Sequence, residues 1–253
     1  MTTILLARHG QASFGDANYD KLSALGCQQA QMLGQHYAHT QRRIDAVFSG
    51  SLVRQQDSAR HFWQAYQASL VGANKAAANA AIIDFDNPES YIIQGFDEFN
   101  HKDIFFKSNP TFSSQAAIAI ELAKSADAHQ SLAEWFDIAM QRWHAGAHDN
   151  YIESWVQFNE RAAQAFAQVR AKTAQMQNGD ADSSVLVFTS GGVIAAITAQ
   201  LLRQDSQSAY QLNKSLINTG VTAITIREPA AHLLSFNEHS HLFAEGESFI
   251  TWR

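Results

Sequence analysis

An arginine, a histidine and a glycine stand side by side near the start of the sequence, directly after a short apolar run. In "LLARHGQASFG" the run ends at Ala7, and Arg8, His9 and Gly10 follow. A guanidinium group can bind phosphate oxygens through two parallel hydrogen bonds, and an imidazole can act as a nucleophile. Gly10 allows the backbone to turn tightly. The triplet therefore predicts anion chemistry at the end of a strand.

Two further apolar runs end in residues that can contact an anion. "VFSGSLVRQQDSAR" leads into a helix whose first turn carries Arg54, and the free N–H groups at a helix start favour anions. "VFTSGGVIAAIT" passes from strand to helix through Ser190 and Gly191, and Ser190 is in position to cap that helix. Taken singly, each motif also fits an ordinary surface arginine or an economical strand-to-helix turn.

The strands that must position these residues are short and apolar. Runs at 4–7, 44–49, 185–189 and 221–226 are rich in β-branched or apolar residues and predict buried strands. Helical spacing separates the first two strands, and a long helical pattern beginning near Trp155 runs until Asn178-Gly179. This order predicts a three-layer α/β/α fold with a mostly parallel central sheet, whose ligands lie beyond the carboxyl ends of the strands.

The middle of the sequence has a different pattern. No strand alternation is found between Lys102 and Asn150, so we predict a helical cap insertion at about 102–150 within a single domain spanning 1–253. The run "ANKAAANAA" at 73–81 fits either a helix end or a connection.

Composition excludes several classes of partner. The formal net charge is −6, which gives no general attraction for nucleic acid or anionic lipid. The apolar run before Arg8 is too short for a signal peptide, and no window has the length of a membrane helix. The single cysteine, Cys27, cannot form an internal disulfide. We expect a soluble, cytoplasmic protein without nucleic-acid or membrane partners, and the oligomeric state is left open.

Together, these motifs resemble the histidine phosphatase superfamily, which has the phosphoglycerate-mutase-like fold. "LLARHGQASFGDANYDKLSALGCQQAQ" is similar to the opening signature of that family, "FSGSLVRQQDSA" to its second motif and "TSGGVI" to its His-Gly-Gly element. "NTGVT" and "SFNEHSHL" fit its closing strands. The resemblance covers both ends of the chain and leaves the insertion unexplained.

The resemblance assigns a role to each residue that matches the family pattern. It implies that His9 is the nucleophile that takes the phosphoryl group, while Arg8 and Arg54 hold the phosphoryl oxygens. Glu98, in "GFDEFNHKD", would protonate the leaving oxygen and then activate water, with Asp97 as the rival carboxylate. The remaining phosphate-binding positions are Ser190 and Gly191. The resemblance implies a phosphorylated small-molecule substrate and neither a metal ion nor a cofactor.

The sequence departs from the family pattern at Ser190, where the family has a second histidine. A serine hydroxyl carries no positive charge, so the change would cost ~2–4 kcal/mol of transition-state stabilisation unless another group compensates. His101, three residues after Glu98, is our first candidate for that group, and His239 and His241 are the others. Alternatively, Ser190 itself donates a hydrogen bond with the help of water.

Three functions remain open at this point. The favoured one is a metal-independent phosphomonoester hydrolase that works through a phosphohistidine at His9. The alternative is a weakly active or inactive family member that binds a phosphorylated ligand or partner, which the serine at 190 would explain. A phosphoglycerate mutase is less favoured, because nothing in "DIFFKSNPTFSS" marks a phosphoglycerate site.

Overall fold

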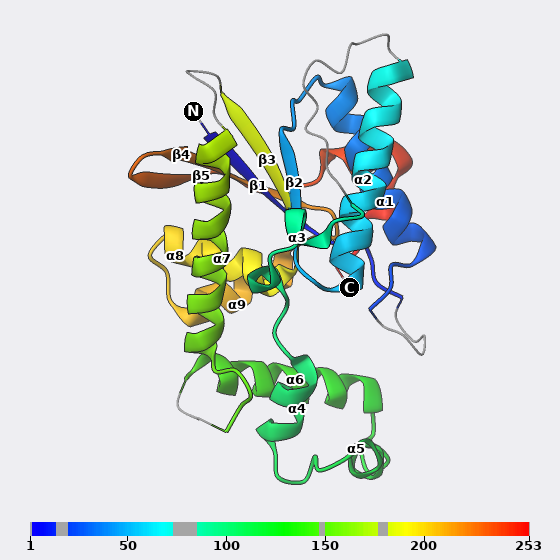
Figure 1. The fold of residues 1–253 in the computed structure, drawn as a ribbon. Coiled ribbons are helices and arrows are strands. Elements are labelled where there is room, and N and C mark those ends of the chain that lie inside the picture. The colour runs from blue at the N-terminus through cyan, green and yellow to red at the C-terminus, as the bar shows by residue number, and fades with distance from the viewer. Residues whose placement is uncertain (1, 14–19, 73–84, 147–149, 177–181, 253) are drawn as a thin grey trace.

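The computed structural model describes residues 2–13, 20–72, 85–146, 150–176 and 182–252 (Figure 1). The strands are β1 (Thr2–Arg8), β2 (Ala46–Ser49), β3 (Ser183–Thr189), β4 (Val221–Arg227) and β5 (Ala230–Glu238). The helices are α1 (Ala24–His39), α2 (Val53–Gly72), α3 (Pro88–Tyr91), α4 (His101–Ser108), α5 (Gln115–Leu122), α6 (Ala128–His144), α7 (Trp155–Met176), α8 (Gly191–Leu201) and α9 (Ser206–Ser215). Short 3-10 turns are η1 (Gln94–Phe96), η2 (Ser240–Glu245) and η3 (Glu247–Phe249). None of these described helices combines the length and apolar character needed to span a membrane.

The strands form one mixed sheet in the order β2-β3-β1-β4-β5. The pairs β2–β3 and β3–β1 are parallel, whereas β4 runs antiparallel to both β1 and β5. The four strands predicted from apolar runs are all present, and their bounds differ from the prediction by two residues at most. The α/β fold class with a mostly parallel core is therefore confirmed.

Each face of the sheet is covered by helices, which makes three layers (Figure 1). Side chains alternate along β1, so Ile4 and Leu6 belong to a cluster shared with α7 and α8, while Leu5 and Ala7 pack with α1 and α2. These four side chains of β1 are fully buried. The central strand is thus apolar on both faces, as the continuous run in the sequence predicts.

Three helices, α4, α5 and α6, fall inside the segment for which the sequence predicts a helical insertion, and they lie beyond the lower end of α7 in Figure 1. Aromatic rings join this segment to the rest of the molecule. The ring of Trp143 lies 5.2 Å from Trp155 and 5.5 Å from Phe158, both on α7. The run at 73–81 and the predicted helix stop at Asn178-Gly179 lie outside the described residues.

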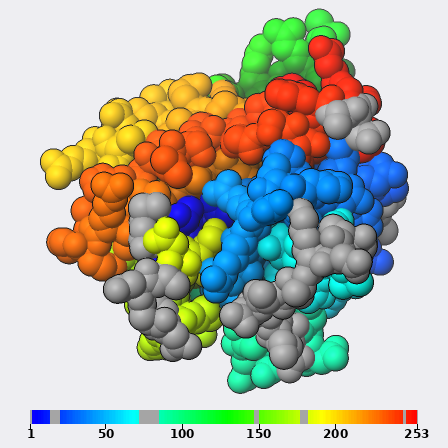
Figure 2. Space-filling model, turned by 90° about the horizontal axis from the view of Figure 1, so that it is seen from above, coloured from blue at the N-terminus to red at the C-terminus, as the bar shows by residue number. Residues whose placement is uncertain are grey.

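The segment from η2 to Thr251 runs back along the N-terminal part of the chain. Figure 2 shows this segment, in red, beside the blue residues of the N-terminal part. Gln29 on α1 donates from Nε2 to the carbonyl of Phe249 at 2.8 Å and to Oγ1 of Thr251 at 2.9 Å. The backbone of Thr251 accepts from Asn218 N at 2.8 Å, and its hydroxyl donates to Asn218 Oδ1 at 2.9 Å. These bonds tie the segment to the turn before β4.

Candidate active site

His9 follows directly after the central strand β1, and its backbone is fixed from two sides. Its N–H donates to the carbonyl of Thr189 at 2.8 Å, and its carbonyl accepts from Asn218 Nδ2 at 3.0 Å. The next residue has to be glycine because of a close contact: a Cβ atom on Gly10 would lie 2.3 Å from the carbonyl oxygen of Gly26. The backbone thus holds His9 rigidly at the carboxyl end of the sheet.

The imidazole of His9 is buried and has both ring nitrogens engaged. Nδ1 lies 2.7 Å from the carbonyl oxygen of Gly10, so Nδ1 carries the proton and donates it. Nε2 accepts from Nε of Arg54 at 3.1 Å. Burial, followed by the charges of Arg54 and Arg8, lowers the pKa of His9 well below its ordinary value of 6.5. The ring is therefore neutral at neutral pH, with a lone pair on Nε2.

Arg54 is the second residue of α2, as the sequence predicts, and is 7% exposed. Asp20 holds it in place, because Asp20 Oδ1 accepts from Arg54 Nη1 at 2.7 Å. The other oxygen, Oδ2, accepts from the N–H of Val53 at 3.0 Å and so caps the start of α2. Arg8 donates from Nη1 to the carbonyl of Leu216 at 2.5 Å. Arg54 thus contacts the His9 ring directly, and the charge of Arg8 also acts on that ring.

Glu98 reaches the same place from the segment between η1 and α4. Its Oε1 accepts from the N–H of Phe99 and its Oε2 from the N–H of Gly192, both at 3.2 Å. Burial raises the pKa of Glu98 above its ordinary 4.5, against the opposing effect of those N–H groups and of Arg54 and Arg8. A Cβ atom on Gly192 would lie 2.3 Å from Oε1, so only glycine lets the carboxyl approach the start of α8.

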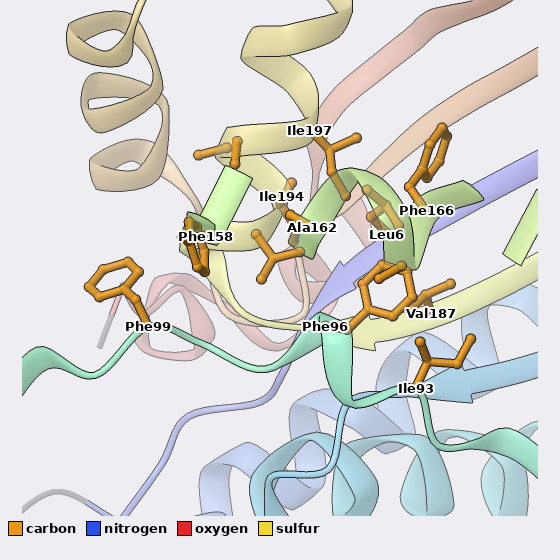
Figure 3. Close-up of a cluster of buried hydrophobic side chains, with 14 of the residues drawn as sticks. Leu6, Ile93, Phe96, Phe99, Phe158, Ala162, Phe166, Val187, Ile194 and Ile197 are labelled. Carbon is orange, nitrogen blue, oxygen red and sulfur yellow. The ribbon is translucent and has the colours of Figure 1, made fainter. Parts of the chain in front are cut away.

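Two buried phenylalanines anchor the segment that carries Glu98. Figure 3 shows Phe96 in the cluster with Val187 and Leu6, and Phe99 beside Phe158. The rings of Phe99 and Phe158 meet edge to face at 5.4 Å. Because Phe96 and Phe99 are 0% and 4% exposed, the carboxyl between them has little freedom to move.

The rival carboxylate, Asp97, is engaged elsewhere. Its Oδ1 accepts from the N–H of Ser51 and its Oδ2 from the Ser51 hydroxyl, both at 2.5 Å. These bonds fasten the segment before Glu98 to the turn between β2 and α2. Asp97 therefore has a structural contact on each oxygen.

Ser190 lies at the end of β3 and is fully buried. It occupies the N-cap position of α8, but its hydroxyl makes no capping bond, so the expectation that its side chain caps the helix is wrong. Its oxygen instead accepts from Nε2 of Gln55 at 2.8 Å. The next residue, Gly191, lies close to Arg8, since a Cβ there would be 3.7 Å from Arg8 Nε.

The three histidines proposed to compensate for Ser190 lie in different places. His101 begins α4, its ring 4.3 Å from that of Phe99, and its charge would act on His9. Desolvation and then the charges of Arg54 and Arg8 lower the pKa of His101 to about 4, so it is neutral at neutral pH. Of the other two, His239 Nδ1 bonds to the Asn237 carbonyl and His241 Nε2 to the Thr219 hydroxyl. His101 is the one of the three that lies with the arginines.

Sequence reasoning missed Asp20 and Gln55. Asp20 lies outside the strands and helices predicted from the sequence, so no periodic pattern points to it. Gln55 does have a signal: it shares helical spacing with Ala59 and Phe62, and all three are fully buried. A polar residue in the buried stripe of a helix needs a hydrogen-bond partner, and here that partner is Ser190.

The described part of the chain contains no group of three or more His, Cys, Asp or Glu side chains placed to hold a metal ion. The arrangement instead presents a neutral imidazole, two guanidinium groups, a carboxyl with a raised pKa and a buried hydroxyl. Such a set can neutralise an anion and move a proton.

Solved structures with the same fold come from several organisms. A phosphoserine phosphatase variant from Entamoeba histolytica in complex with phosphoserine aligns with a TM-score of 0.58 at 18% identity, covering 96% of this chain and 100% of that one. A mycobacterial glucosyl-3-phosphoglycerate phosphatase with VO3 gives 0.60 at 18%, covering 93% and 99%. A phosphoglycerate mutase from Bacillus anthracis gives 0.58 at 15%, covering 95% of each chain.

A comparison with curated proteins finds no match. The family model of the histidine phosphatase superfamily (branch 1) matches residues 4–73 and 115–239. These two ranges include most of β1 and the whole of α2 and β3, and with them Arg8, His9, Arg54 and Ser190. The chain belongs to the histidine phosphatase superfamily.

Proposed function

We propose that this protein is a metal-independent phosphomonoester hydrolase that works through a phosphohistidine at His9. The observation that carries the proposal is the state of the His9 ring. Its Nδ1 proton is held by the Gly10 carbonyl, and its Nε2 lone pair faces a guanidinium group at 3.1 Å. A neutral imidazole beside fixed positive charge is suited to attack a phosphoryl group. The fold shared with two phosphatases supports the same function.

In the first step, Nε2 of His9 bonds to phosphorus while the bond between phosphorus and the ester oxygen breaks. Arg54 releases Nε2 and turns its N–H groups to the phosphoryl oxygens, which Arg8 and the N–H of Gly191 also contact. Glu98 gives its proton to the departing oxygen, so the product is a neutral alcohol. The raised pKa of Glu98 keeps that proton available.

In the second step, water attacks phosphorus and the bond to Nε2 breaks. Glu98, now a carboxylate, takes one proton from the water, and inorganic phosphate leaves. The neutral imidazole and the protonated carboxyl are restored. Positioning and charge neutralisation by the guanidinium groups supply most of the acceleration, because phosphoryl transfer needs little covalent help.

Trapping the intermediate tests this proposal. The protein is incubated with a phosphoester labelled in its phosphoryl group and quenched in alkali. We expect acid-labile label on the wild type and none on His9→Ala, while His39→Ala, at an exposed position on α1, keeps the label. Absence of both label and turnover across a panel of phosphoesters would overturn the proposal.

A second function, phosphate binding with little hydrolysis, is favoured by one observation. Ser190 offers an uncharged hydroxyl where the family resemblance expects a histidine. If this function is correct, calorimetry shows binding of inorganic phosphate, wild-type turnover is close to zero, and Ser190→His raises it. Efficient turnover by the wild type would exclude this alternative.

A further inference from the structure

We propose that Gln55 is a positioning residue that fixes the hydroxyl of Ser190 as an uncharged hydrogen-bond donor to the transferring phosphoryl group. This inference rests on the proposed function, because it concerns the pocket in which that transfer takes place. It also explains how a chain with serine at 190 can work without a second histidine.

The side-chain amide of Gln55 is fully buried, and its orientation is fixed. Nε2 donates one hydrogen to the carbonyl of Phe96 at 3.0 Å and the other to Ser190 Oγ at 2.8 Å. A backbone carbonyl can only accept, so the amide nitrogen and not the oxygen must face Phe96. The hydroxyl of Thr189 donates to the same carbonyl at 2.7 Å, which holds Phe96 in place.

This orientation decides what Ser190 can do. An amide NH₂ group has no lone pair to offer, so the Ser190 oxygen is the acceptor in this bond and its own hydrogen is left for another acceptor. No hydrogen bond donated by the Ser190 hydroxyl is found among the described residues. A fully buried hydroxyl requires an acceptor, and a phosphoryl oxygen is one.

The strand register places Ser190 beside His9. Arg8 pairs with Thr189 across the parallel strands β1 and β3, so the next residues along, His9 and Ser190, are also neighbours. The bond from His9 N to the Thr189 carbonyl continues this register past the end of β1. Gly191 then turns towards Arg8. Ser190 thus neighbours His9 across the strands, and the residue after it lies close to Arg8.

The turn after β2 is shaped to admit the Gln55 amide. A Cβ atom on Gly50 would lie only 2.0 Å from Gln55 Oε1, so a side chain at position 50 would displace the amide. The glycine therefore has a steric role in this arrangement. The buried position of Gln55, the open turn at Gly50 and the two acceptors of its N–H groups all favour one placement of the amide.

An uncharged donor differs from an imidazolium in one measurable way. Ser190 keeps its proton throughout the reaction and donates only a hydrogen bond to the oxygen that gains charge. Neither a serine hydroxyl nor a glutamine amide gains or loses a proton between about pH 4 and about pH 10. The contribution of this pair is therefore independent of pH.

A double-mutant cycle tests the coupling between the two residues. The variants are Ser190→Ala, Gln55→Met and both together, with Gln56→Met as the matched control, because Gln56 is the next residue of α2 and donates to the Ser51 carbonyl instead. We measure turnover of p-nitrophenyl phosphate and the affinity for orthovanadate. We expect kcat to fall about 100-fold for Ser190→Ala and about tenfold for Gln55→Met, with the double variant no worse than Ser190→Ala.

The outcomes separate this inference from the hydrolase proposal. Losses that multiply in the double variant, or a Gln55→Met variant with wild-type kcat and vanadate affinity, would overturn the role of Gln55 while leaving the hydrolase intact. If the wild type shows no turnover but the variants lose vanadate affinity in a coupled way, the role of the pair would be supported and the hydrolase proposal overturned. A wild type that neither binds vanadate nor turns over substrate would overturn both.

A second substitution covers the case in which Gln55→Met does not fold. Gln55→Glu keeps the size of the side chain, but a carboxyl group has at most one hydrogen for two acceptors. It cannot satisfy both the Phe96 carbonyl and the Ser190 oxygen, so kcat is expected to fall at every pH. Wild-type kcat in Gln55→Glu would contradict the proposed orientation.

Discussion

The carboxylate of Asp20 binds the guanidinium group of Arg54 at 2.7 Å and at the same time caps the helix on which Arg54 stands, through the N–H of Val53 at 3.0 Å. One side chain therefore fixes both the direction of the cation and the helix start that carries it. The Asp20 side chain is 32% exposed, against 9% for Arg54, so the cation is the more deeply buried partner.

Replacing Asp20 by alanine should affect stability and activity together. Loss of the cap is expected to lower the free energy of unfolding by about 0.5–2 kcal/mol, and a less ordered Arg54 should raise KM for a phosphoester. Urea unfolding and steady-state kinetics measure the two effects. Asp57→Ala is the control, because Asp57 pairs with Arg60 at 3.3 Å on the same helix. Equal effects of the two substitutions would contradict the assigned role.

The role of Glu98 predicts a dependence on the leaving group. A poor leaving group such as an alkyl alcohol needs the proton of Glu98, whereas p-nitrophenol leaves without it. Glu98→Gln should therefore lower kcat about 100-fold or more for an alkyl phosphate and far less for p-nitrophenyl phosphate. Asp97→Asn should show no such difference between substrates, since Asp97 binds Ser51. If Asp97→Asn shows it instead, the acid has been assigned to the wrong carboxyl.

The pH dependence follows from the two shifted groups. His9 must be neutral to attack, and because its pKa is lowered, activity should rise with pH through a value below 6.5. Glu98 must be protonated to act as an acid, and because its pKa is raised, activity should fall as pH rises through a value above 4.5. A profile of kcat/KM for an alkyl phosphate should be bell-shaped. In Glu98→Gln, kcat/KM should no longer fall as the pH rises, but it should still fall at low pH.

His241 should make the fold sensitive to acid. Burial first of all lowers the pKa of His241 to about 3, so the ring stays neutral in the folded protein where the unfolded chain would bind a proton. Its contribution to stability is full above the ordinary pKa of 6.5 and declines as the pH falls from there towards 3. Between pH 7 and pH 5 the share due to His241 is about 2 kcal/mol.

Urea unfolding at those two pH values checks this prediction. His241→Gln keeps a polar side chain that can bond to the Thr219 hydroxyl, and the variant should lose less stability on acidification than the wild type. The matched control is His39→Gln, at an exposed position. Between pH 7 and pH 5 this variant should lose as much free energy of unfolding as the wild type. A wild-type pH dependence in His241→Gln would show that other histidines account for the whole effect.

The sequence predicts the site best where function depends on the ends of strands. The parallel runs before Arg8 and Ser190 place those residues at one edge of the sheet, where Arg54 contacts the ring of His9. What the sequence does not predict is which polar groups meet. Gln55 and Ser190 are separated by 135 residues, and their contact depends on the turn at Gly50 and on the position of Phe96.

Other differences have equally local causes. The Ser190 oxygen accepts from a buried amide and not from the start of α8, and no helix-start pattern can reveal that partner. Strand β5 lies at the edge of the sheet and alternates between exposed and half-buried side chains along its first part, so it lacks the continuous apolar signal of the inner strands. The resemblance to the closing strands of the family predicts only the second half of β5.

The bonds that join Thr251 to Asn218, and Asn218 to the carbonyl of His9, have a consequence for biosynthesis. Asn218, which holds the carbonyl of His9, lies 209 residues further along the chain. During synthesis the backbone of His9 therefore gains this bond only after Asn218 has been made, and Asn218 gains its bonds to Thr251 later still, so the structure around position 9 depends on contacts that are distant in sequence.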